Sequence, residues 1–91
     1  MSLTIRIPTQ LRDLTGGAGQ VEVEAASVGE ALKALDAAHA GVADRLFDDS
    51  GGLRRSVNVF LADEDVRFLE GLATPIVAGQ TLSIVPAVAG G

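Results

Sequence analysis

Apolar residues recur with a two-residue period along four stretches of the chain, and this period predicts β-strands. The stretches are residues 3–7, 21–24, 57–61 and 81–85. Successive side chains of a strand point to opposite faces, so each stretch offers one apolar face to a core. Pro86 is expected to close the last strand, because proline has no N–H to donate to the ladder of a sheet.

The spacing of apolar residues becomes helical after Ser27. Ser27 and Glu30 stand at the spacing of a capping box, which satisfies free N–H groups at a helix start, so a helix is expected to begin there. Its apolar positions are Val28, Leu32 and Leu35. Gly41 is expected to end this helix, and residues 42–47 are expected to add a short turn.

The remaining segments predict connections. Residues 15–19 contain three glycines and are expected to form the long loop of a hairpin between the first two strands. Residues 48–52 predict a polar loop, residues 63–65 an acidic turn and residues 66–68 a short strand. Residues 74–80 are expected to be irregular.

The order strand, strand, helix, strand, short strand, strand predicts an α+β domain. One main helix on one face of a mixed sheet of four to five strands is the simplest way to bury the apolar stripes. A chain of 91 residues fits one domain with one hydrophobic core. We expect a folded domain over residues 1–86 and a flexible, extended tail over residues 87–91.

Composition limits the partners. Apolar residues make up 47% of the chain but only three are aromatic, all of them phenylalanine, so the core is expected to be aliphatic. The absence of cysteine excludes disulfides and thiolate metal sites. A net charge of −5 disfavours nucleic acids and anionic membranes as partners. The N-terminal residues do not resemble a signal peptide, so the expected location is the cytoplasm.

Candidate catalytic groups are scarce. The single histidine, His39, falls on the apolar side of the predicted helix, where a position at the edge of the core is the simplest interpretation. The sequence has no G-x-S-x-G motif and no P-loop. The three acids at residues 63–65 are typical of a solvated turn. We therefore expect no catalytic residue and no metal site in this chain.

The chain ends in Gly90 and Gly91, and two terminal glycines arise by chance in roughly one chain of this glycine content in 70. Residues 87–91 carry no charged or bulky side chain and reach about 17 Å when extended. Glycine lacks a Cβ, so such an end fits a narrow channel and can present its carboxylate to another protein. A carboxylate must be activated before it reacts, usually by conversion to an acyl-adenylate with ATP. This chain has no nucleotide-binding motif, so a partner protein would have to bind the ATP.

The C-terminal residues 86–91 resemble the end of the MoaD/ThiS sulfur carrier proteins. Residues 57–60, 63–68 and 71–74 are similar to the CysO branch of that family. Residues 79–86 fit as well, although Gln80 stands where many members have aspartate. The resemblance covers nearly the whole chain and implies the ubiquitin-like β-grasp fold.

The resemblance also implies a mechanism in which the chain is a cosubstrate rather than an enzyme. An activating enzyme of the ubiquitin-activating type would use ATP to adenylate Gly91, and sulfide or a persulfide would convert it to a thiocarboxylate. The sulfur would pass to a synthase, which in the CysO branch is a cysteine synthase that uses O-phosphoserine. A zinc metallopeptidase would then trim the cysteine adduct. The chain itself would bind no cofactor.

The resemblance implies roles for individual residues. Gly91 would carry the sulfur and Gly90 would give a slim approach, while the recognised tail would comprise Pro86, Ala87, Val88 and Ala89. From strand parity, Phe60 and Val85 are expected to face away from the core as an apolar docking patch. The alternative is that they cover a second small core.

Other functions stay open at this point. The same fold and activation would serve a ubiquitin-like modifier that is joined to lysines through Gly91. The chain could equally be the small subunit of molybdopterin synthase, or could supply sulfur to a secondary-metabolite pathway. An interaction domain with an inert tail is the remaining alternative.

Overall fold

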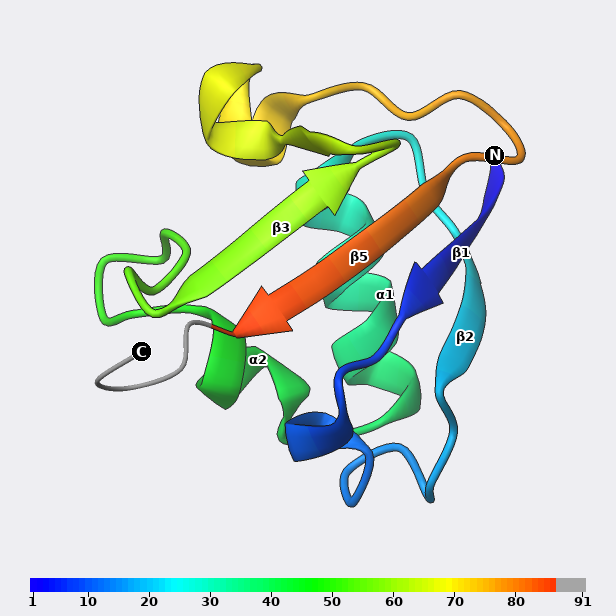
Figure 1. The fold of residues 1–91 in the computed structure, drawn as a ribbon, viewed down its shortest axis with the longest axis vertical. Helices are drawn as coiled ribbons and strands as arrows, with labels where there is room; N and C mark the ends of the chain where they lie inside the picture. Colours follow the sequence, from blue (N-terminus) through cyan, green and yellow to red (C-terminus); the bar gives the residue numbers. More distant parts are fainter. Residues whose placement is uncertain (87–91) are drawn as a thin grey trace.

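A five-stranded mixed sheet forms the centre of the computed structural model, which describes residues 1–86 (Figure 1). The strands are β1 (Ser2–Arg6), β2 (Gln20–Glu24), β3 (Val57–Leu61), β4 (Glu64–Asp65) and β5 (Thr81–Pro86). They lie in the order β2-β1-β5-β3-β4, with β5 parallel to β1 and the other pairs antiparallel. The α+β class and the mixed sheet predicted from the sequence are confirmed.

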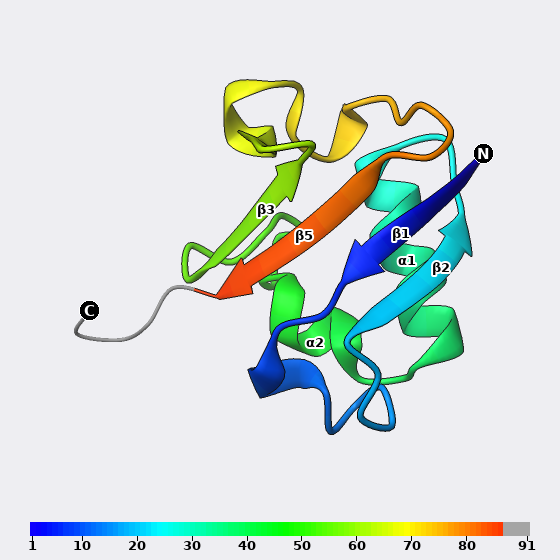
Figure 2. The same cartoon turned by 45° about the vertical axis from the view of Figure 1, so that its right-hand side comes forward.

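Two helices cover one face of this sheet, and the other face is left open (Figures 1 and 2). The main helix α1 spans Val28–Ala38 and the short helix α2 spans Val42–Leu46. Ser27 caps α1 as predicted, since its hydroxyl accepts from the Glu30 amide at 3.2 Å and lies 3.2 Å from the Glu30 carboxylate. Gly41 separates the helices with a φ of 102°, a conformation that glycine adopts without strain.

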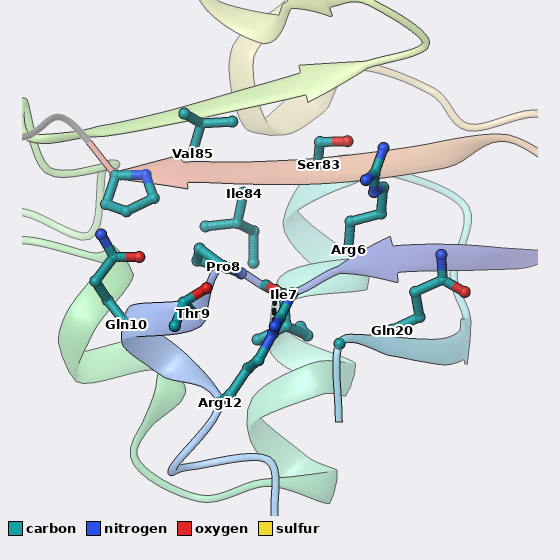
Figure 3. Close-up of a pocket in the computed structure, with 12 residues that line it drawn as sticks. Arg6, Ile7, Pro8, Thr9, Gln10, Arg12, Gln20, Ser83, Ile84 and Val85 are labelled. Carbon is teal, nitrogen blue, oxygen red and sulfur yellow. Dashed lines mark hydrogen bonds between the residues drawn. The ribbon is translucent and has the colours of Figure 1, made fainter. Parts of the chain in front are cut away.

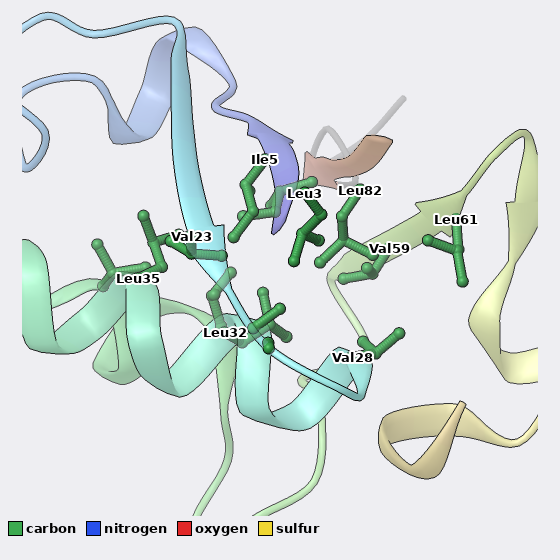
Figure 4. Close-up of a cluster of buried hydrophobic side chains, with 14 of the residues drawn as sticks. Leu3, Ile5, Val23, Val28, Leu32, Leu35, Val59, Leu61 and Leu82 are labelled. Atoms are coloured by element: carbon green, nitrogen blue, oxygen red, sulfur yellow. The ribbon is translucent and has the colours of Figure 1, made fainter. Parts of the chain in front are cut away.

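The core is aliphatic, as expected from the composition. The inward residues of the strands meet the apolar side of α1, where Leu32 and Leu35 are fully buried (Figure 4). No aromatic side chain is buried among residues 1–86. The buried strand residues include Leu3, Ile5, Val23, Val59, Leu61, Leu82 and Ile84. The spacing of apolar residues therefore identified the inward face of each long strand.

The prediction of a short strand over residues 66–68 is wrong. Val66–Phe68 is a 3₁₀ helix, and the short strand β4 lies two residues earlier, in the segment that was expected to be an acidic turn. Leu61 pairs with Glu64, so the turn between β3 and β4 contains only Ala62 and Asp63. Both have positive φ, at 50° and 75°, as the tightest hairpin turns require.

Candidate functional site

The described chain ends on β5, the central strand of the sheet. Pro86 is the last described residue, and it pairs with Val57 at the start of β3. Hydrogen bonds to β1 and β3 fix β5 on both sides, so the point from which the tail begins is set by the sheet. The predicted tail residues Ala87, Val88, Ala89, Gly90 and Gly91 lie outside the described residues.

Phe60 and Val85 lie together on the open face of the sheet. Asn58 pairs with Val85 and Phe60 pairs with Ser83, so Phe60 and Val85 are diagonal neighbours across two strands. Val85 is 42% exposed and Phe60 is half-buried. Their placement away from the core agrees with strand parity, and their docking role stays a prediction.

The structure contradicts the alternative that these residues cover a second core. The side chains that share the open face are only partly buried or exposed in the described part of the chain. They include Thr4, Arg6, Asn58, Phe60, Ser83 and Val85. Figures 1 and 2 show α1 and α2 on the opposite face.

One row of paired residues crosses the open face from Gln20 of β2 at one edge to Asp65 of β4 at the other, where Asp65 pairs with Phe60. Arg6 of β1 pairs with Gln20 on one side and with Ser83 on the other, and Ser83 in turn pairs with Phe60. This row places the Arg6 guanidinium one strand away from Val85 and two strands away from Phe60. Arg6 is exposed, and its charge is therefore available at the surface.

An open groove of about 860 Å³ begins at this row and runs to the end of β5 (Figure 3). Arg6 and Arg12 supply its two charges, and Val85 and Pro86 line the end from which the tail begins. The Nε of Arg12 donates to the carbonyl of Ile7 at 3.2 Å, which fixes this side chain beside the groove. The sequence pattern does not predict the groove. Arg12 reaches the end of β1 only through the folded path of residues 9–19, which the pattern does not specify.

Groups that could perform chemistry do not gather elsewhere in the described residues. His39 is half-buried at the end of α1, which agrees with a position at the edge of the core. Residues 1–86 contain no cluster of three or more histidine, aspartate or glutamate side chains suited to a metal ion. Hydrogen bonds from the Ser50 hydroxyl and from the Ser50 and Gly52 amides lower the pKa of Asp48 below its ordinary value. All three bonds lie within the loop at residues 48–52, so they stabilise that loop.

Within the described residues, none of the helices has the length and apolar character needed to cross a membrane.

Comparison with known proteins identifies the family. The ThiS family model matches residues 5–91. The chain is 46% identical to the sulfur carrier protein CysO of Mycobacterium tuberculosis, and the match covers 100% of both chains. It is 35% identical to small archaeal modifier protein 3 of Haloferax volcanii, again over 100% of both chains.

A solved structure with the same fold is the CysO chain of the BexX/CysO complex from Amycolatopsis orientalis. That chain is 46% identical, with a TM-score of 0.92, and the match covers 98% of this chain and 99% of the other. The ubiquitin-like β-grasp fold that the resemblance implied is therefore confirmed, as is the similarity to the CysO branch.

Proposed function

Because the chain belongs to the ThiS family, we propose that it is a sulfur carrier whose Gly91 carboxylate becomes a thiocarboxylate. The observation that carries this proposal is 46% identity to a sulfur carrier over the full length of both chains. The family match also extends to residue 91 and so includes the terminal glycines. We place this activity in the cytoplasm, where ATP is available to the activating enzyme.

The proposed reaction has two steps, and a partner supplies the ATP site. A carboxylate oxygen of Gly91 attacks the α-phosphorus of ATP, which gives an acyl-adenylate and releases pyrophosphate. Hydrosulfide then attacks the acyl carbon and displaces AMP. Where a persulfide attacks instead, it forms an acyl disulfide, and a thiol cleaves the S–S bond to leave the thiocarboxylate and a disulfide. The bond that breaks is the C–O bond to AMP, and the bond that forms is the C–S bond of the thiocarboxylate.

In this reaction the chain itself presents its C-terminal residues to the active site of the partner. The sheet fixes the origin of the tail at Pro86, and Ala87, Val88 and Ala89 would form the segment that partners recognise. Gly90 and Gly91 would pass through a channel too narrow for larger side chains. Phe60 and Val85 would dock against the partner beside the origin of the tail.

We propose that the sulfur is delivered to a synthase that makes cysteine, as the name of the CysO relatives suggests. The solved complex of a similar CysO chain with BexX supports docking of such carriers onto a second protein. A zinc metallopeptidase that trims the cysteine adduct would complete the sequence of reactions. Delivery to another biosynthetic synthase would use the same carrier chemistry.

The experiment that tests the proposal is intact mass measurement after reaction. The full chain is incubated with ATP, sulfide and the activating enzyme of its own organism, and replacement of one oxygen by sulfur should add about 16 Da. A variant that lacks Gly91 should show no such gain while its melting temperature is unchanged. No mass gain in the unaltered chain would overturn the proposal.

A protein modifier is the second candidate function. The observation in its favour is 35% identity to small archaeal modifier protein 3 over the whole length of both chains. This function would join Gly91 to lysines of other proteins through an isopeptide bond. Mass spectrometry of proteins from the native cells would detect branched peptides that carry the C-terminal residues of this chain, and their absence would exclude this function.

A further inference from the structure

The groove beside the tail has an unusual charge for this protein. The chain has twelve acidic and seven basic residues, and yet the part of the chain that the structure describes lines the groove with two arginines and no acidic residue. Within residues 1–86 neither Arg6 nor Arg12 forms an ion pair. Among the described residues, the groove is therefore a positive surface without an acidic side chain, on an acidic molecule.

The orientation of Arg12 is fixed by its surroundings. Its Nε donates to the carbonyl of Ile7, and within residues 1–86 its two terminal nitrogens donate no hydrogen bond. One of these nitrogens lies so near Gly19 that an added Cβ there would come within 3.3 Å of it. A guanidinium held in this way loses less freedom on binding, which favours recognition of a carboxylate by paired hydrogen bonds.

The position of the groove indicates which protein would fill it. Val85 and Pro86 line the groove, and the tail begins at the next residue. A protein that takes up the tail must therefore come close to this surface. Two arginines on a molecule of net charge −5 do not suit a nucleic acid, which demands many more basic residues.

We propose that Arg6 and Arg12 bind aspartate or glutamate side chains of the partner protein that takes up the tail. This inference rests on the proposed function, since it concerns the docking of a carrier onto its partner. The carboxylates would lie beside the partner's tail channel, and Phe60 and Val85 would contact its apolar surface. The charge pairs would fix the orientation in which the tail enters.

The test uses BexX of Amycolatopsis orientalis as the probe, because a chain similar to this one forms a solved complex with it. Its dissociation constant for the full chain is measured by isothermal titration calorimetry. Arg6→Glu and Arg12→Glu should each weaken binding about tenfold or more, which corresponds to about 1.4 kcal/mol. Lys33→Glu changes the charge equally but lies on α1, on the other side of the sheet, and should alter binding less than about twofold.

Two further measurements separate charge recognition from damage to the fold. Arg6→Gln removes the charge without reversing it and should weaken binding by about threefold, with an unchanged urea midpoint. Raising the salt concentration should weaken binding of the unaltered chain more than binding of Arg6→Glu, because screening acts on the charge pair.

Three results would overturn the inference. They are equal binding by the Arg6, Arg12 and Lys33 variants, equal salt dependence with and without Arg6, and no binding of the unaltered chain to BexX. The mass measurement tests the carrier function separately. If the chain gains mass but all variants bind equally, the role of the groove is refuted and the carrier function is supported. If binding depends on the arginines but the chain gains no mass, the role of the groove is supported and the carrier function is refuted.

Discussion

Arg67 stabilises the start of β3 through contacts that lie far apart in the sequence. Its guanidinium donates to the Asn58 side chain at 2.7 Å and to the carbonyls of Val57 and Arg54 at 2.8 Å. Among residues 1–86, the short strand β4 pairs only with Phe60 and Leu61, and the earlier part of β3 has no strand neighbour on that side. Arg67 thus occupies an edge that would otherwise expose unpaired backbone groups.

We predict that Arg67→Ala lowers the free energy of unfolding by about 1–2 kcal/mol, because three hydrogen bonds from a charged group are lost at a partly exposed site. Urea denaturation monitored by circular dichroism measures the change. Arg55→Ala serves as the control, since Arg55 is exposed and forms no side-chain hydrogen bond in the described structure. Equal effects of the two substitutions would show that the contacts of Arg67 contribute little.

The sequence could not reveal this role of Arg67. Two of its acceptors are backbone carbonyls, 10 and 13 residues away, and the path between them depends on the turn after β3. The contrast with Ser27 is informative. The cap at Ser27 was predictable because the hydroxyl and its partner, the Glu30 amide, are three residues apart in a local pattern.

The hairpin between β3 and β4 is the element in which sequence reasoning failed. A two-residue turn with positive φ at both positions normally contains Asn-Gly or Asp-Gly, and this chain has Ala62 and Asp63 instead. Because residues 62–63 carry no turn signal, the sequence pattern places the turn at the three acids 63–65 and the short strand at residues 66–68. The four longer strands and α1 were predictable because their apolar positions have a clear period.

We predict that Ala62→Asn raises the free energy of unfolding by about 0.5–1 kcal/mol, because asparagine tolerates positive φ better than alanine does. Ala62→Val at the same position should lower it by about 1 kcal/mol or more, since a β-branched side chain is strained at positive φ. Both values come from urea denaturation. A gain in stability for the valine variant would contradict the backbone conformation of this turn.

The fold separates packing and docking onto two faces of one sheet. One face packs on α1 and α2 and contributes the buried core. The open face carries Arg6, Ser83 and Phe60 in one row, and β5 runs along it to the origin of the tail. Strand parity was sufficient to predict that Phe60 and Val85 share this face. The register that brings Arg6 into the same row depends on the pairing of distant strands, which the sequence pattern does not specify.

Phe60 and Phe68 allow a direct test of the open face as the docking surface. Both phenylalanines are outside the core, and Phe68, in the 3₁₀ helix after β4, is 84% exposed. We predict that Phe60→Ser raises the KM of the activating enzyme for this chain about five- to tenfold, because apolar contact area is lost beside the origin of the tail. Phe68→Ser should change KM less than about twofold.

The measurement is the rate of thiocarboxylate formation as a function of carrier concentration, followed by intact mass. The rate at saturation should differ little between the two variants, since neither substitution alters the Gly91 carboxylate that reacts. Circular dichroism before the assay establishes that each variant is folded. If Phe68→Ser raised KM as much as Phe60→Ser does, docking would extend to the exposed 3₁₀ helix, and the assignment of the open face alone would be wrong. If Phe60→Ser left KM unchanged, the apolar patch would have no part in binding the activating enzyme.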